Sequence, residues 1–440
     1  MEYELIAFLM FSTMMLLLMT GQRVYGAIGF VGVMAALMLW GNGSTDLAFT
    51  SMMKMMKWYP LLTLPLFIFM GYMLSETGVA EDLYHMFYIW MGGVNGGLAI
   101  GTIGLMVVIS AMNGLSVAGM AIGTTIALPQ LLKKGYDKVM VTGVIQAGSS
   151  LGILVPPSVV LVLYGMIARQ PVGKLWLAGA IPGLLMAFFF ILYIYLRCKM
   201  NPSLAPAMTK AERLEITWKE KMSCLKAGIP PLFIFFCMTG LFLMGITSLV
   251  ESSAVGAVSA SLIAILKRRL TRPILHEITK KTLLISCMFM WIIVAALCFG
   301  AVFDGLGAVR FVKEFFTSDL GLGPWEILIL MQLTYIVMGM FLDDTAMLVI
   351  VAPLFIPLAG ALGFDLVWYG VLYTITCQIA YMTPPFGYNL FLMRAMAPPE
   401  ITLKDIYSSV IPFVSIMIVS LILIMVYPEI ALWLPETYYK

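Results

Sequence analysis

Charge is scarce in this chain. Only 11% of its 440 residues are Asp, Glu, Lys or Arg, whereas 61% are hydrophobic. A soluble domain of this size carries charge on about a quarter of its residues, so the composition excludes one. The net charge of +3 is too small to indicate binding to nucleic acid. The composition instead predicts a protein embedded in a membrane.

Clusters of metal-binding residues are lacking as well. The two histidines, His85 and His276, lie far apart in the sequence. Six cysteines occur without a C-x-x-C pair, at Cys198, Cys224, Cys237, Cys287, Cys298 and Cys377. Because zinc sites draw on closely spaced Cys and His, the sequence argues against a zinc site.

Apolar runs of membrane-spanning length are abundant. They recur from Leu5–Met19 to Ile411–Tyr427, and about 20 apolar residues cross a bilayer as a helix. We expect about ten to twelve passes, together with shorter re-entrant pieces. The acidic start Met1–Glu4 differs from the basic start of a cleaved signal peptide, so the first run is interpreted as a retained span.

One unusual pattern occurs twice. Val155–Ser158 in the first half and Thr383–Phe386 in the second each interrupt an apolar run with a Pro-Pro pair, and the pairs are 228 residues apart. The same shift relates Ala118 to Ala346, Pro129 to Pro357, Gly135 to Gly363 and Asp137 to Asp365. Paired interruptions at corresponding positions of two halves indicate the binding site of a transporter. The sequence therefore predicts a membrane transporter with an internal repeat.

The predicted fold is an all-α polytopic membrane protein with two helical hairpins and two broken helices. Residues 1–200 form the first repeat, 201–226 a polar cytoplasmic linker and 227–440 the second repeat. Within the repeats we expect scaffold spans at 5–41 and 228–266, arms at 45–58 and 270–282, and transport elements at 61–165 and 283–394.

The basic residues predict that the two repeats have opposite orientations. Basic loops are retained in the cytoplasm, which places Lys133–Lys138 and Arg197–Lys226 there. The repeat counterpart of the first loop, Ala361–Leu366, has no basic residue. This asymmetry is typical of an inverted-topology duplication. It predicts that the N-terminus and the C-terminus are both periplasmic.

The broken spans carry the first candidate chemistry. A proline leaves the carbonyl four residues earlier without its helical partner, which frees carbonyls at Gly152–Ile153 and at Ala380–Tyr381. Freed carbonyls near hydroxyls suit a hard cation such as Na⁺, and the hydroxyls here are Ser149, Ser150, Ser158 and Thr383. The alternative is a simple kink whose polar groups are satisfied by neighbouring helices. The repetition of the motif favours the functional interpretation.

Two hairpin turns carry the second group of candidate functional residues. Asn113–Ala118 corresponds to Phe341–Ala346, and both lie within apolar runs. Asp343 and Asp344 are costly inside a membrane unless an ion or partner compensates them, so at least one is predicted to coordinate a cation. The alternative is a carboxylate at an aqueous hairpin tip. Arg169 is a candidate for attracting an anionic substrate, although basic residues at span ends usually act as topological anchors.

These residues carry a family resemblance that runs nearly from end to end. The motifs are Leu64–Gly71, Gly114–Ala118, Gly135-Tyr136, Leu151–Ser158, Tyr164-Gly165, Ala178–Gly183, Glu251–Ala257, Phe341–Asp343 and Thr383–Phe391. Together they resemble the large membrane (M) subunit of TRAP (tripartite ATP-independent periplasmic) transporters. The family usually has Ser-Gly-Ser-Ser at the first hairpin, whereas Asn113 and Leu115 replace two of these serines here.

The resemblance implies a sodium-coupled secondary importer, not an enzyme, that works as an elevator in the bacterial inner membrane. Na⁺ is the coupling ion, and no organic cofactor is implied. A periplasmic substrate-binding (P) protein would deliver a small carboxylate-bearing acid. A small four-helix membrane (Q) subunit would extend the scaffold as a separate chain. The absence of a G-x-x-x-x-G-K-[ST] motif also leaves an ion gradient as the driving force.

Two sodium sites and a substrate site are predicted. The first sodium site is expected at Gly114, Ser116, Ser149, Gly152 and Pro156. The second is expected at Gly339, Asp343, Thr345, Ala380, Thr383 and Gly387. Substrate binding is assigned to Asn113, Ser150, Ser158, Asp344, Asn389 and Arg169. An ion channel and an intramembrane protease are the alternatives, but polar breaks at only two matched positions argue against the first. The lack of a second Asp motif like Gly339–Asp343 argues against the second.

Overall fold

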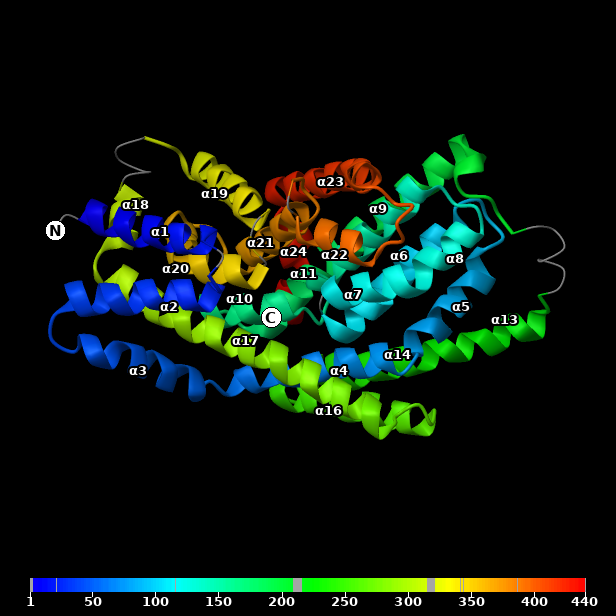
Figure 1. Cartoon of the computed structure of the whole chain (residues 1–440), viewed down its shortest axis with the longest axis horizontal. Coiled ribbons are helices and arrows are strands. Elements are labelled where there is room, and N and C mark those ends of the chain that lie inside the picture. The colour runs from blue at the N-terminus through cyan, green and yellow to red at the C-terminus, as the bar shows by residue number, and fades with distance from the viewer. Residues whose placement is uncertain are drawn as a thin grey trace.

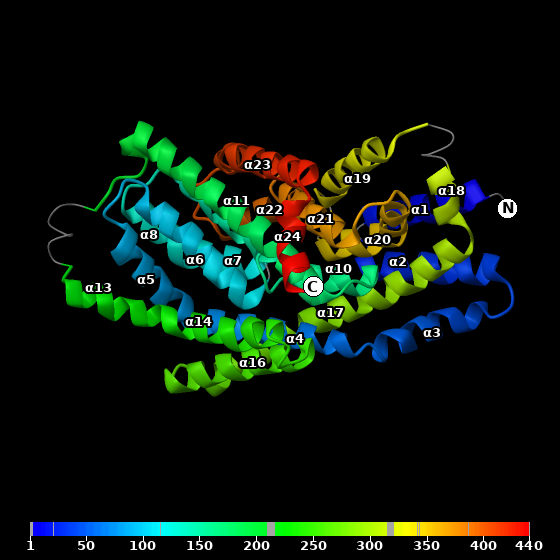
Figure 2. The same ribbon diagram turned by 180° about the vertical axis from the view of Figure 1, so that it is seen from behind.

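The computed structural model describes residues 3–20, 22–114, 116–208, 216–314, 321–340, 342, 344–385 and 387–439. Within these ranges the regular elements are all helical (Figures 1 and 2). The first half contains α1 (Tyr3–Met19), α2 (Val24–Ala35), α3 (Ser44–Met56), α4 (Thr63–Glu76), α5 (Val79–Met91), α6 (Gly97–Asn113), α7 (Ser116–Ile122), α8 (Leu128–Lys133), α9 (Lys138–Ser150), α10 (Val159–Ala168) and α11 (Val172–Met200). The second half contains α13 (Trp218–Cys224), α14 (Ile229–Phe235), α15 (Leu241–Leu243), α16 (Leu249–Leu266), α17 (Arg272–Gly305), α18 (Ala308–Glu314), α19 (Pro324–Gly339), α20 (Asp344–Ala361), α21 (Leu366–Tyr381), α22 (Tyr388–Met396), α23 (Leu403–Val426) and α24 (Glu429–Tyr438).

The all-α membrane fold predicted from the sequence is confirmed. By length and composition, six helical stretches of the described chain can cross a membrane: Tyr59–Glu76, Val172–Met200, Trp218–Leu243, Leu249–Leu266, Arg272–Gly305 and Leu403–Val426. Six shorter helices are also apolar. A helix rises 1.5 Å per residue, so the shorter ones fall below the length of a full span. Four of them, Gly97–Ile109, Val159–Ala168, Pro324–Gly339 and Leu366–Tyr381, overlap the predicted transport elements, whereas Glu4–Leu17 and Tyr25–Trp40 overlap the predicted scaffold spans.

The repeat is visible in the helices themselves. The shift of 228 residues places the start of α9 on the start of α21, and the stretch from α7 to α8 on α20. Asp137 accepts a 2.9 Å hydrogen bond from the amide of Met140, and Asp365 accepts a 2.8 Å bond from the corresponding amide of Trp368. Both caps satisfy amides that a helix start leaves free. Figure 1 shows α8 toward the end that carries α13, and α20 toward the opposite end beside α18.

The arm of the second repeat is continuous with the element after it. The predicted arm at 270–282 and the start of the transport elements at 283 both fall within α17, one helix of 34 residues. After Pro273 at its start, no proline or glycine occurs before Gly300, so nothing interrupts the backbone. In the first repeat, Trp58 leaves the helical conformation, and a short 3₁₀ turn over Tyr59–Leu62 separates α3 from α4.

An aromatic cluster holds the two repeats together beside the breaks. The hydroxyl of Tyr164 on α10 donates a 2.7 Å hydrogen bond to the carbonyl of Leu366. Its ring contacts those of Tyr369 and Tyr373 on α21, and the hydroxyls of Tyr335 and Tyr369 are 2.8 Å apart. Buried tyrosines of this kind combine a large apolar contact with a satisfied polar tip. They fix α10 of the first repeat against α19 and α21 of the second.

Candidate functional site

The first break begins where α9 ends. A 3₁₀ turn over Leu151–Ile153 leads into the cis Pro156-Pro157 bond, and Ser158 starts α10. The hydroxyl of Ser158 donates to the carbonyl of Ile153 and accepts from the amide of Leu161 at 3.1 Å. One of the two carbonyls predicted to be free is therefore taken by Ser158. This side chain, which we assigned to substrate, is fully buried and caps a helix.

The tip of the first hairpin docks on this break. Gly114, between α6 and α7, has a φ of 66°, which favours glycine. Its carbonyl accepts a hydrogen bond from the amide of Val159 at 3.3 Å. A Cβ built on Gly114 would lie 2.3 Å from the carbonyl oxygen of Pro157, and one on Gly119 would lie 3.1 Å from Cα of Ser149. The hairpin thus fits closely against the break because it carries glycines at both contacts.

Three buried polar side chains join the hairpin to both breaks. The hydroxyl of Ser116 donates to Oδ1 of Asn389 at 3.2 Å, and Nδ2 of Asn389 lies 3.5 Å from the hydroxyl of Ser149. Their exposed fractions are 3%, 0% and 1% in the order Ser116, Asn389, Ser149. Asn389 follows the second break, whereas the two serines belong to the first repeat. Residues predicted for separate sodium and substrate sites therefore meet in one place.

A second buried contact crosses between the repeats. Nε2 of Gln378, on α21, donates a 2.8 Å hydrogen bond to the carbonyl of Ser150. The other amide atom, Oε1, is buried and has no hydrogen-bond partner among the described residues. Sequence reasoning missed Gln378. The available signal was an amide in the middle of an apolar span, where an uncompensated polar group is costly.

The second break is closed by local hydrogen bonds. The amide of Thr383 donates to the carbonyl of Ala380 at 3.2 Å, and the amide of Gly387 donates to the carbonyl of Thr383 at 3.2 Å. A Cβ on Gly387 would lie 2.4 Å from the carbonyl oxygen of Tyr381. Gly339, at the end of α19, lies against α21, because a Cβ there would be 2.6 Å from that of Ala380. The second hairpin therefore also contacts the broken helix of its own repeat.

Other predicted site residues lie at the first break and at the two hairpin tips. Gly152 is buried within the 3₁₀ turn of the first break. Asp343 lies outside the described residues. Only the backbone is described for Asn113, Asp344 and Thr345, which lie at the ends of α6 and α20 that face the hairpin tips.

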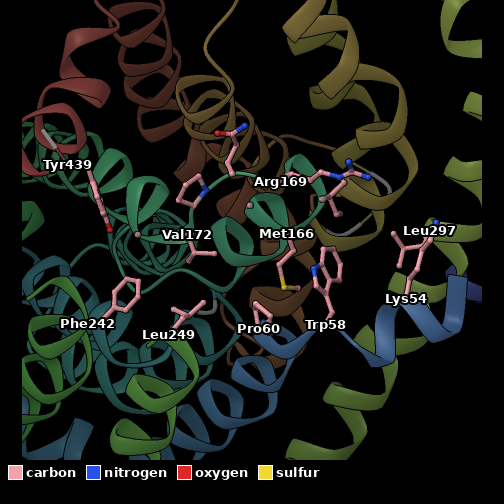
Figure 3. A pocket seen from close by; sticks show the side chains of 15 residues that line it. Lys54, Trp58, Pro60, Met166, Arg169, Val172, Phe242, Leu249, Leu297 and Tyr439 are labelled. Carbon is pink, nitrogen blue, oxygen red and sulfur yellow. The ribbon is translucent and has the colours of Figure 1, made fainter. Parts of the chain in front are cut away.

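Arg169 lies away from the breaks. It follows α10, which separates it from Ser158 by roughly 15 Å at the rise of a helix. Its side chain is exposed and lines a cavity of about 680 Å³ together with Lys54 and Trp58. Figure 3 shows these side chains around the cavity. The structure thus does not bring Arg169 to the place where Ser116, Ser149 and Asn389 meet.

The atoms gathered at the breaks are carbonyl, hydroxyl and amide oxygens. Within the described residues, no three His, Cys, Asp or Glu side chains lie together in a group that could hold a metal ion. Oxygen donors of this kind suit hard cations, whereas zinc and copper prefer nitrogen and sulfur. The oxygen atoms at the breaks are therefore donors of the type that hard cations prefer.

The comparison with known proteins decides the family. The profile described as "Tripartite ATP-independent periplasmic transporter, DctM component" matches residues 11–430. This chain belongs to that family. The TRAP large permease DctM of Vibrio cholerae serotype O1, named for C4-dicarboxylates, is 31% identical over 398 residues and covers 86% of each chain. The ectoine TRAP large permease TeaC of Halomonas elongata is 26% identical, over 98% of this chain and 99% of its own.

A solved structure supports the fold of this TRAP large permease independently. The YdaH transporter of Alcanivorax borkumensis aligns with a TM-score of 0.66 at 14% identity, over 90% of this chain and 91% of its own. The resemblance noted in the sequence is confirmed by these matches. So is the prediction of a multi-pass transporter subunit that is not an enzyme, because the relatives are named as permeases.

Proposed function

We propose that this TRAP large permease is the sodium-coupled, substrate-translocating subunit of an importer for small organic acids in a bacterial inner membrane. The observation that carries the proposal is the buried contact of Ser116, Asn389 and Ser149. It joins the first hairpin and both broken helices at one point. In transporters with discontinuous helices, such a point is where ions and substrate bind.

Sodium would be held mainly by oxygen atoms that the breaks expose. The first site comprises the hydroxyls of Ser116 and Ser149 with backbone carbonyls at Gly114 and Gly152. The unpaired Oε1 of Gln378 adds a buried acceptor close to Ser150. A cation nearby would compensate this oxygen, because a buried polar atom without a partner is costly. The second site would use Thr383, the carbonyls near Ala380 and Gly387, and a carboxylate of the second hairpin, Asp343.

Two glycine hinges support an elevator movement. Gly78, with φ 72°, joins α4 to α5, and Gly307, with φ 81°, joins α17 to α18. Gly78, and Gly305 two residues before the second hinge, lie against the ends of corresponding scaffold helices. Arg269, just after α16, donates to the carbonyl of Gly78 at 2.6 Å, and Trp40, at the end of the π-helical turn after α2, lies against Gly305. A body carrying both hairpins and both breaks can therefore turn against the scaffold at two equivalent points.

Partner proteins are expected from the tripartite description of the family. A small four-helix membrane subunit would pack on the scaffold, where α14 exposes Leu232 and Phe233 at 68% and 51%. A periplasmic binding protein would deliver the substrate. The carboxylate class rests on the name of the Vibrio cholerae relative, and selectivity among acids lies partly in the binding protein.

The test is uptake by proteoliposomes that contain the complete transporter with its cognate binding protein. Accumulation of an acid such as succinate under an inward sodium gradient, and its loss when sodium or the binding protein is omitted, is the expected result. Robust accumulation driven by a proton gradient in sodium-free buffer would contradict sodium coupling. Flux that needs no binding protein and shows no counterflow would support a channel instead.

A further inference from the structure

A large cavity opens between the scaffold and the second broken helix. Its volume is about 1180 Å³. Its walls come from the start of α2, from one face of α17 and from the first residue of α22. The lining side chains that the argument uses are Arg23, Tyr25, His276, Lys280, Trp291 and Tyr388. It is separate from the cavity beside Arg169.

The charge of this cavity has one sign. Arg23, Lys280 and His276 all line it, and none of the described residues that line it is acidic. His276 and Lys280 are four residues apart on α17, so they lie on the same face of the helix. Neither Arg23 nor Lys280 has an ion-pair partner among the described residues. Such a wall attracts anions and repels cations.

The next lysine along α17 points elsewhere. Lys281 forms a 2.8 Å ion pair with Glu76 on α4 and lies 3.8 Å from Glu277. The acidic side chains near this part of α17 are thus paired on the side of the helix that faces α4. Lys280 and His276 remain on the cavity side. Lys281 is consequently a matched control for Lys280.

The cavity wall also carries an aromatic surface beside one of its cations. The guanidinium of Arg23 donates a 3.0 Å hydrogen bond to the hydroxyl of Tyr25, and the ring of Tyr25 lies 6.3 Å from that of Trp291. This arrangement holds a cation beside an aromatic surface. Tyr388, on the other side, is the first residue of α22 and directly precedes Asn389, so the cavity reaches the helix that carries the buried contact at the breaks.

We infer that Arg23, His276 and Lys280 form a carboxylate-binding subsite on the scaffold, which holds the anionic substrate as it passes between the second break and bulk water. The inference rests on the proposed function, because it takes the cargo to be a small organic acid. The aromatic pair Tyr25 and Trp291 packs against the carbon skeleton, and the basic side chains bind the carboxylates. The substrate is thereby contacted by both the scaffold and the moving body.

Cys287 provides a reporter inside the cavity, because its exposed side chain is one of those that line it. The experiment uses the complete transporter with Cys287 as the only cysteine of this chain. Its modification rate is measured with two methanethiosulfonates, one that carries a sulfonate and one that carries a quaternary ammonium. Each rate is divided by the rate at which the same reagent reacts with a free thiol in solution. At low ionic strength we expect the anionic reagent to react about fivefold faster. Arg23→Gln together with Lys280→Gln should abolish the preference, and Lys281→Gln should leave it.

The same protein separates this inference from the proposed function. Succinate should slow the modification of Cys287 at concentrations where sulfate of equal ionic strength does not. Three results would overturn the subsite. They are equal normalised rates for the anionic and the cationic reagent, a rate ratio that the double substitution leaves unchanged, and protection of Cys287 by sulfate as strong as that by succinate. If sodium-driven uptake is intact in that case, the proposed function stands without it. A charge-selective cavity in a protein that fails to transport would reject the proposed function alone.

Discussion

The side-chain amide of Gln378 donates a 2.8 Å hydrogen bond to the backbone carbonyl of Ser150, and these two residues are 228 residues apart. The same shift relates the two halves of the chain, so each residue is the repeat counterpart of the other. Their contact therefore lies where the two repeats meet. It ties the end of α9, just before the first break, to the last turn of α21, just before the second.

Gln378→Met tests whether the unpaired oxygen of this amide serves sodium. The substitution leaves the carbonyl of Ser150 without its donor, which lowers the free energy of unfolding by about 1–3 kcal/mol. It also removes the unpaired acceptor Oε1, which raises that free energy by a similar amount. We expect little change in thermal stability in detergent but a several-fold loss of apparent sodium affinity in uptake. Gln332→Met is the control, because Gln332 accepts from Thr376 and its unpaired atom is the donor Nε2, which cannot bind a cation. Equal sodium affinity in both variants would exclude Gln378 as a ligand.

Gly114→Ala tests the docking of the first hairpin. A methyl group would lie 2.3 Å from the carbonyl oxygen of Pro157, in addition to the strain of about 1–2 kcal/mol that a left-handed backbone costs a non-glycine residue. Uptake should fall at least about tenfold, because the tip can no longer close on the break, while the yield of inserted protein is retained. Gly363→Ala is the control, with a φ of 85° but open space around it. If both variants transport equally, docking of the tip is not required.

Asp343→Asn tests the second sodium site. Neutralising a carboxylate beside a cation removes a full charge in surroundings of low dielectric constant. It should weaken the sodium dependence of uptake more than Ser116→Ala or Ser149→Ala, each of which removes one neutral ligand. The measurement is the sodium concentration for half-maximal uptake. An unchanged value in Asp343→Asn would identify this carboxylate as a charge at an aqueous hairpin tip.

The orientation of the repeats is tested by labelling single cysteines in whole cells. Lys133→Cys, at the end of α8, and Ala361→Cys, at the end of α20, replace exposed residues at corresponding positions. In a background without native cysteines, a membrane-impermeant maleimide should label Ala361→Cys and spare Lys133→Cys until the cells are permeabilised. Labelling of both from one side would rule out inverted topology.

Features fixed by local backbone chemistry could be predicted from the sequence. The Pro-Pro pairs mark both breaks, and the shift of 228 residues between them relates Asp137 to Asp365, which the structure shows as the caps of α9 and α21. What could not be predicted is which residues meet across the repeats. Asn389 contacts Ser116 and Ser149 only because α22 packs on α7 and α9, and no spacing in the sequence encodes that packing.

Side-chain roles were harder to predict than positions. Ser158 occupies the expected break but caps α10, since a serine before a helix start competes for its free amides. Arg169 has the right charge for an anionic substrate, yet the length of α10 carries it away from the contact point. The boundary predicted at 282–283 falls inside α17, because no helix-breaking residue lies there.

The central claim is that substrate and sodium cross together through the site at the breaks. The most direct measurement is the entry of radioactive sodium into proteoliposomes that contain the complete transporter, with and without substrate-loaded binding protein. We predict that loaded binding protein accelerates sodium entry in proportion to substrate uptake, and that Gly114→Ala abolishes both fluxes while Gly363→Ala keeps them. Substrate accumulation without accompanying sodium entry would contradict the account.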